Sequence, residues 1–123
     1  MHNLSLGLRG EESAVDFLKK NGFKILERNF RTNFGQIDII AKEKNEICFI
    51  EVKTRKNFNF GLPQEAVSIT KKKRIAKVAL AYLKEKRLLN KKVRFDVVSI
   101  LWDGNIPKIE LIRDAFEVEE AYA

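Results

Sequence analysis

Two carboxylates and a lysine lie on neighbouring predicted strands in an arrangement suited to the chemistry of metals and phosphates. Asp38 lies in an apolar segment at residues 36–41, and Glu51 and Lys53 lie toward the end of a second segment at residues 46–54. Alternate residues of a strand point to the same face, so Glu51 and Lys53 share one. Hard cations such as Mg²⁺ take oxygen ligands, commonly one or two carboxylates with water and a substrate phosphate. The three side chains therefore predict a divalent-cation site beside which Lys53 would reach a phosphate or a water.

The two strands are expected to form a hairpin, because only the polar residues 42–45 separate them. A turn centred between Lys44 and Asn45 would place Asp38 opposite Glu51, and Gln36 opposite Lys53, at one end of the sheet. Side chains opposed in this way have Cβ atoms roughly 5 Å apart, so the two carboxylates would repel each other unless a cation lay between them. The alternative is a sheet end open to water, with Lys53 in a salt bridge. The placement depends on the register, since a slip of one residue exchanges the two faces.

A third carboxylate, Glu11, is predicted on the inward face of a helix at residues 10–20. At about 100° per residue, Ala14, Val15 and Leu18 all lie within about 60° of it. A glutamate in the first turn of a helix also interacts favourably with the helix dipole, which is the alternative explanation.

The remaining segments predict an α/β domain. A strand is expected at residues 23–30, a turn at 33–35, and a long helix at 70–88 with Ile75, Val78, Ala79, Tyr82 and Leu83 on its apolar face. Strands at 93–102 and 106–112 follow, the last at a sheet edge because of Pro107. The order αβββαββ indicates a five-stranded mixed sheet flanked by helices, in one domain spanning residues 1–123.

The charge of the chain favours a polyanionic partner. Lys and Arg number 24 against 17 Asp and Glu, which gives a formal net charge of +7. Lys71, Lys72, Lys73 and Arg74 open the long helix, where cations are unfavourable unless an anion such as a DNA phosphate is near. Arg31 and Arg55 are further candidate phosphate contacts. The alternative for the lysine run is a solvated charged face.

Two phenylalanines and an aspartate outside the acidic pair could have either a binding or a structural role, and the cysteine and histidine content bears on disulfides and zinc. Phe58 and Phe60 could stack on unpaired bases or pack beneath their own loop. Asp96 could pair with Arg94. Cys48 and His2 are the only cysteine and histidine, so no internal disulfide or zinc cluster is expected. No signal peptide or membrane span is recognisable, so a cytoplasmic protein is expected.

Asp followed by Glu-x-Lys on adjacent strands, after a helix with an inward Glu, resembles the PD-(D/E)XK superfamily with its restriction-endonuclease-like fold. The whole chain resembles the YraN-type bacterial family, which is related to archaeal Holliday junction resolvases. The motifs that carry the resemblance are Gly10-Glu11 with Ala14, Leu18 and Gly22, then Glu27-Arg28-Asn29-Phe30-Arg31, Gly35-Gln36-Ile37-Asp38, Phe49-Ile50-Glu51-Val52-Lys53-Thr54-Arg55, Gly61, Glu65-Ala66-Val67, Lys71 and Arg94-Phe95-Asp96-Val97-Val98.

The resemblance implies that Asp38 and Glu51 bind Mg²⁺ or Mn²⁺, together with the carbonyl of Val52, and that Glu11 adds a ligand or a water contact. Lys53 would position the attacking water or stabilise the charged transition state. The family commonly has Glu where this chain has Gln36, so one negative charge is missing near the site. This difference weakens a two-metal scheme more than a one-metal scheme.

Three classes of function follow. The first is a metal-dependent endonuclease acting on branched or structured DNA. The second is a nucleic-acid-binding module that keeps the fold with little or no catalysis, and the third is a protein-interaction domain. The choice between DNA and RNA stays open. Resolvases of the superfamily act as dimers, so a homodimer is one expectation.

Overall fold

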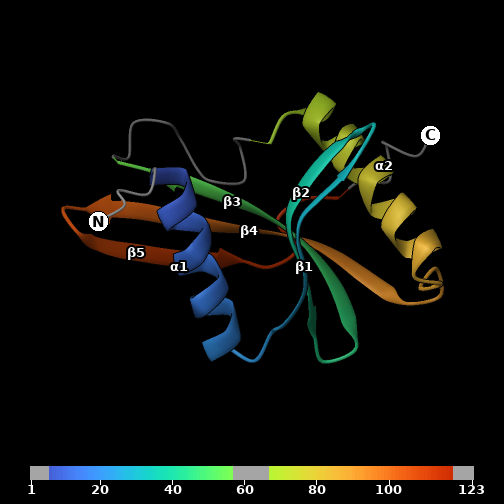
Figure 1. Cartoon of the computed structure of the whole chain (residues 1–123), viewed down its shortest axis with the longest axis horizontal. Coiled ribbons are helices and arrows are strands. Elements are labelled where there is room, and N and C mark those ends of the chain that lie inside the picture. Colours follow the sequence, from blue (N-terminus) through green and yellow to red (C-terminus); the bar gives the residue numbers. More distant parts are fainter. Residues whose placement is uncertain (1–5, 57–66, 118–123) are drawn as a thin grey trace.

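The computed structural model describes residues 6–56 and 67–117, which form a five-stranded sheet with a helix on each side (Figure 1). The elements are α1 (Leu6–Lys20), β1 (Lys24–Thr32), β2 (Gly35–Glu43), β3 (Glu46–Arg55), α2 (Ile69–Glu85), β4 (Lys92–Asp103) and β5 (Ile106–Ile112). The spatial order of the strands is β1-β2-β3-β4-β5. Only β3 and β4 are parallel; the other neighbouring pairs are antiparallel. The predicted element order, the mixed sheet and the edge position of β5 are confirmed.

Each face of the sheet has its own apolar core, because alternate residues of β3 point in opposite directions. Ile47 and Phe49 pack with the α2 side, and Cys48 and Ile50 pack with the α1 side. All five apolar residues predicted for the long helix are buried in α2. β3 is thus covered on both faces along its first half, which explains its unbroken apolar sequence.

The helix ends differ from the predicted ones for identifiable reasons. α1 begins at Leu6 and not at Gly10, which lies inside the helix. A Cβ at Gly10 would lie 2.1 Å from Oγ1 of Thr54, so the glycine permits a close approach of α1 to β3. Ser68 caps α2 by accepting a hydrogen bond from the N–H of Lys71 (3.1 Å). α2 ends at Glu85, before the expected 88, and Arg87 then adopts a positive φ of 57°.

The β2–β3 register matches the prediction up to the point where the strands separate. Ile40 pairs with Phe49, and Ile39 with Ile50, which is the last pair of the ladder. Beyond it the β1–β2 hairpin continues alone and turns toward α2 (Figure 1). Ile37 does not share the face of Ile39, as the alternation of a regular strand would require, because the twist of the free hairpin directs Ile37 into the α2 core.

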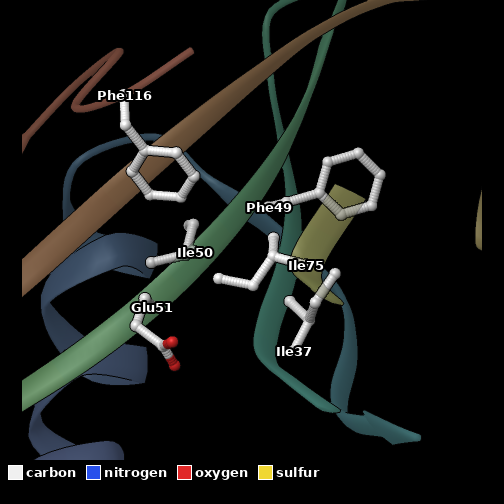
Figure 2. Close-up of a pocket in the computed structure, with 6 residues that line it drawn as sticks. All are labelled: Ile37, Phe49, Ile50, Glu51, Ile75 and Phe116. Carbon is white, nitrogen blue, oxygen red and sulfur yellow. The ribbon is translucent and has the colours of Figure 1, made fainter. Parts of the chain in front are cut away.

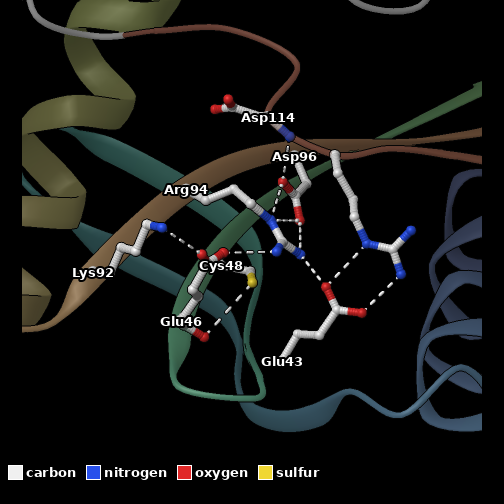
Figure 3. Close-up of polar contacts among 8 residues, drawn as sticks. Glu43, Glu46, Cys48, Lys92, Arg94, Asp96 and Asp114 are labelled. Atoms are coloured by element: carbon white, nitrogen blue, oxygen red, sulfur yellow. Dashed lines mark hydrogen bonds and ion pairs between the residues drawn. The ribbon is translucent and has the colours of Figure 1, made fainter.

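An ion-pair network lies near the other end of β3 (Figure 3). Asp96 is fully buried and accepts hydrogen bonds from Nε of Arg94 (2.9 Å) and from the N–H of Asp114 (2.9 Å). Arg94 also contacts Glu43 and Glu46, at 2.6 and 2.8 Å. The predicted Asp96–Arg94 pair is confirmed. The hydrogen bond from Asp114 to Asp96 also holds the segment after β5 against β4.

Neither described helix is long and apolar enough to cross a membrane. Phe58 and Phe60 lie outside the described residues. Cys48 is a buried free thiol, and burial is the main reason that its pKa is raised to about 12.

Candidate functional site

The carboxyl groups of Asp38 and Glu51 meet where β2 separates from β3. The backbone N–H of Val52 donates to Oδ2 of Asp38 (2.8 Å). This contact occupies the place of the next ladder bond, because the strand pairing has ended at Ile39 and Ile50. The two carboxyl groups lie close enough together that Glu51 raises the pKa of Asp38. The predicted cross-strand meeting of the two acids therefore occurs, although they are not a pair of the regular ladder.

Glu51 extends from β3 into a narrow, mostly apolar pocket (Figure 2). The side chains of Ile37, Phe49, Ile75 and Phe116 line it, and Glu51 is only 7% exposed. Such surroundings make an isolated carboxylate costly. A group that neutralises the charge is therefore required.

Lys71 supplies one positive charge to this pocket. Its Nζ lies 2.8 Å from Oε2 of Glu51 in an ion pair. The contact lacks hydrogen-bond geometry, and Oε2 is buried with no hydrogen-bond partner among residues 6–56 and 67–117. Oε2 of Glu51 therefore has the ammonium of Lys71 beside it but keeps unused capacity to accept a hydrogen bond or to bind a cation.

The Asp38 carboxyl group has a pKa well above that of an ordinary aspartate. Its pKa is raised from 3.8 to about 7, first by burial and then by the hydrogen bond and negative charge of Glu51. The Val52 N–H and the charge of Lys71 oppose this rise. The raised pKa reflects the cost of placing two carboxylates side by side in a buried position, and a divalent cation between them would relieve that cost.

Glu11 reaches this pair only through two amides. Oε1 of Glu11 accepts from Nδ2 of Asn29 (2.8 Å), and Oδ1 of Asn29 accepts from Nε2 of Gln36 (2.8 Å). The same Nε2 lies 3.4 Å from Oδ1 of Asp38. Glu11 also faces Arg28 at 3.4 Å. No three His, Cys, Asp or Glu side chains gather in a metal-holding group within the described segments, so Glu11 lies at the end of a relay.

The other predicted residues occupy different positions around the site. Lys53 is half-buried on β3, two residues beyond Glu51, and Arg55 is half-buried further along. Lys72 lies over the ring of Phe116 at 5.7 Å. The predicted phosphate contacts Lys73, Arg74 and Arg31 are exposed. The basic run therefore has two kinds of position, since Lys71 faces a carboxylate of the protein while Lys73 and Arg74 are exposed.

The sequence analysis did not foresee the contacts that two residues make at the site. Asn29 has a positive φ of 51°, which turns its amide between Glu11 and Gln36. Asparagine tolerates this conformation better than most residues, but nothing nearby in the sequence marked it as special. The inward position of Lys71 had a signal, since it precedes Ile75, Val78 and Tyr82 at helical spacing on the buried face of α2.

The donor set fits a hard divalent cation. Two carboxylates approach each other, and one buried oxygen lacks a hydrogen-bond partner in the described part of the chain. Mg²⁺ is commonly bound by one or two carboxylates and completes its coordination with water. Asp38 and Glu51 are the residues that would hold it.

Comparison with known families settles the relationship of the chain. The model of the uncharacterised protein family UPF0102 matches residues 10–100. The chain belongs to this family. UPF0102 proteins from Geobacter metallireducens and Geotalea daltonii are 48% and 50% identical to it, over 96% and 94% of this chain and 97% and 92% of theirs. A third UPF0102 protein, from Dictyoglomus turgidum, is 45% identical over 94% of the chain and 100% of its own length. The family resemblance seen in the motifs is confirmed.

Among solved structures, this UPF0102 chain shows similarity to EndoMS in a complex with double-stranded DNA. The TM-score is 0.43 at 22% identity, and the match covers 77% of this chain and 36% of that one. Pyrococcus furiosus SfsA in complex with Ca²⁺ matches with a TM-score of 0.38 at 12% identity, over 86% of this chain and 63% of that one.

Proposed function

We propose that the chain hydrolyses phosphodiester bonds in DNA with a divalent cation held by Asp38 and Glu51. The observation that carries this proposal is the meeting of two acidic side chains in a mostly buried position at the open end of the β2–β3 ladder. Burying two carboxylates together is unfavourable without a proton or a cation between them. Two apolar side chains in this pocket would stabilise the fold more than two acids do, so the acidic pair is better explained by a function than by stability.

The residues of the chain take distinct roles in this proposal. A bound Mg²⁺ or Mn²⁺ would activate water and stabilise charge on the phosphate. Val52 fixes Asp38 by donating its N–H, and the Glu11–Asn29–Gln36 relay fixes the other oxygen. Lys53, on the same strand as Glu51, would hold the attacking water or the developing negative charge. Glu11 thus acts as a positioning residue and not as a direct ligand.

DNA as the partner is supported by the distribution of charge. The net charge is +7, and α2 carries a run of cations with no acidic residue before Glu85. A basic face of this kind attracts a phosphate backbone and makes binding dependent on salt. The family resemblance to resolvases favours branched DNA as the substrate and a homodimer as the working form.

The test is cleavage of labelled linear and four-way branched DNA in Mg²⁺, in Mn²⁺ and in EDTA. Cleavage should require the metal and fall at least roughly a hundredfold in Asp38→Asn, Glu51→Gln and Lys53→Met, since loss of one charge-stabilising group costs that much in related settings. Binding in EDTA should be nearly unchanged. Lys91→Met, an exposed lysine after α2, is the matched control.

The second candidate function is a nucleic-acid-binding module without catalysis. The ion pair of Lys71 with Glu51 favours it, because a lysine of the protein already partly neutralises the pocket. Salt-sensitive DNA binding with no scission in either metal would select this candidate. Absence of nucleic-acid binding at low salt would leave a protein-interaction domain.

A further inference from the structure

We propose that Phe34, at the tip of the β1–β2 hairpin, is a stacking platform for an unpaired base of the nucleic acid. The inference rests on the proposed function, since it assigns that substrate an unpaired or branched segment. Phe34 is a large aromatic residue that is 50% exposed in the turn between β1 and β2. Base–aromatic stacking tolerates any sequence, because every base has a π-face.

The surroundings of Phe34 are cationic. Nζ of Lys77 lies over the ring, 5.3 Å from its centroid. Every ionisable side chain in residues 28–37 and 69–84, apart from the Tyr82 hydroxyl, is an arginine or a lysine. Arg31 and Arg74 are exposed on the hairpin and on α2. Surfaces that bind single-stranded nucleic acid combine aromatic rings, which stack on bases, with cations, which contact phosphates. Phe34 and the basic side chains around it provide both.

The hairpin tip is held rigidly, which a stacking platform requires. A Cβ at Gly35 would lie 3.8 Å from Cβ of Arg74 and 3.9 Å from Cγ2 of Val78, so the tip rests on α2. The ring of Phe30 meets that of Tyr82 edge-on, with centroids 5.2 Å apart. The backbone N–H of Phe34 donates to Oγ1 of Thr32 (3.0 Å), which fixes the turn itself. Phe34 is therefore exposed by a well-anchored turn.

The distance to the carboxylates suits one substrate that touches both. Phe34 and Asp38 are four positions apart along the chain, about 13 Å at the rise of an extended strand. This length corresponds to roughly four base steps of B-form DNA. A base held at Phe34 would then set which phosphate lies beside Asp38 and Glu51.

The experiment measures binding in EDTA, so that cleavage plays no part. Labelled single-stranded, fully paired and four-way branched DNAs are titrated with the native chain, Phe34→Ala and Phe34→Trp. Phe34→Ala should weaken binding of single-stranded and branched DNA about tenfold and change duplex binding less than about twofold, in line with the contribution of one stacked base. Phe34→Trp should keep the native affinity, and its emission should be quenched by the single-stranded and branched DNAs only.

Leu89→Ala is the matched control, because Leu89 is 59% exposed and lies beyond the C-terminal end of α2. An equal loss for all three DNAs in Phe34→Ala, or unchanged emission of Phe34→Trp on saturation, overturns the inference. Metal-dependent cleavage that persists in Phe34→Ala with its substrate preference intact would reject the platform and leave the proposed function standing. Failure of every chain to bind any of the DNAs would reject the platform together with nucleic acid as the partner.

Discussion

The ammonium of Lys71 lies 2.8 Å from Oε2 of Glu51, and this ion pair joins the first turn of α2 to β3 beside Asp38. The charge of Lys71 lowers the pKa of Asp38 and so partly offsets the repulsion within the acidic pair. A divalent cation at the two carboxylates would need the same oxygen. Lys71 and the cation are therefore expected to compete.

Replacing Lys71 by methionine should have opposite effects on stability and on metal affinity. Without the ammonium the acidic pair loses a counter-charge, so the free energy of unfolding in EDTA should fall by about 1 kcal/mol. The same loss removes a competitor, so Mg²⁺ should bind roughly threefold to tenfold more tightly. Chemical unfolding and calorimetric titration measure the two quantities.

Lys73→Met is the control for this pair of measurements, because Lys73 belongs to the same run but is exposed. It should change neither quantity appreciably. Weaker Mg²⁺ binding in Lys71→Met, comparable to that of Asp38→Asn, would show that Lys71 supports the cation and does not compete with it.

The acidic pair should also make stability depend on pH in EDTA. The folded-state pKa of Asp38 lies above its unfolded value, so the stability that its proton contributes is complete below about pH 3.8 and is lost as pH rises through about 7. The difference between these pKa values corresponds to at most about 4 kcal/mol. Asp38→Asn should remove this dependence and be more stable than the native chain above pH 7.

Unfolding curves of the native chain and Asp38→Asn, recorded at pH 5 and at pH 8.5 in EDTA, measure this difference in pH dependence. At lower pH a different group dominates, since the pKa of Glu43 is lowered to about 2, chiefly by Arg113, and its stabilisation is lost as pH falls from about 4.5 toward 2. Parallel pH profiles of the native chain and Asp38→Asn between pH 5 and 8.5 would contradict the raised pKa of Asp38.

The contact between Gly10 and Thr54 should make α1 intolerant of a single methyl group. Gly10→Ala places a Cβ 2.1 Å from Oγ1 of Thr54, and such overpacking costs about 1–3 kcal/mol. The double variant Gly10→Ala/Thr54→Ala removes the clashing atoms and should recover most of the loss in thermal unfolding. Additive losses in the double variant would show that α1 does not rest on β3 at this point.

The ion-pair network near the opposite end of β3 should depend far more on Arg94 than on Arg113. Arg94→Met leaves the fully buried Asp96 without its counter-charge, which should cost about 3–5 kcal/mol. Arg113 is 50% exposed, so Arg113→Met should cost under about 1 kcal/mol although it also pairs with Glu43. Urea unfolding followed by the fluorescence of the buried Trp102 separates the two, and equal costs would contradict the network as described.

The hairpin register was predictable because local rules determine it. Lys44 and Asn45 form a short turn between two apolar strands, and this turn alone brings Ile40 opposite Phe49 and Asp38 toward Glu51. The buried face of α2 was predictable in the same way, since its apolar positions repeat at helical spacing.

The rest depends on contacts that no local pattern encodes. The position of Ile37 follows from the twist of a hairpin that has left the sheet, and the role of Asn29 follows from one backbone conformation. Lys71 meets Glu51 only because α2 crosses the end of β2, an arrangement set by the packing of distant segments. The candidate ligands were thus predictable from the sequence, but their supporting contacts were not.

The most direct test is calorimetric titration of Mn²⁺ into the native chain, Asp38→Asn and Glu51→Gln at pH 7.5. The native chain should bind the cation, and each variant should bind it at least tenfold more weakly, because each removes one of the two carboxylates proposed as ligands. Asn105→Gln, at the exposed β4–β5 turn, serves as the control and should match the native chain. Equal affinity in all four proteins would contradict a cation site between Asp38 and Glu51.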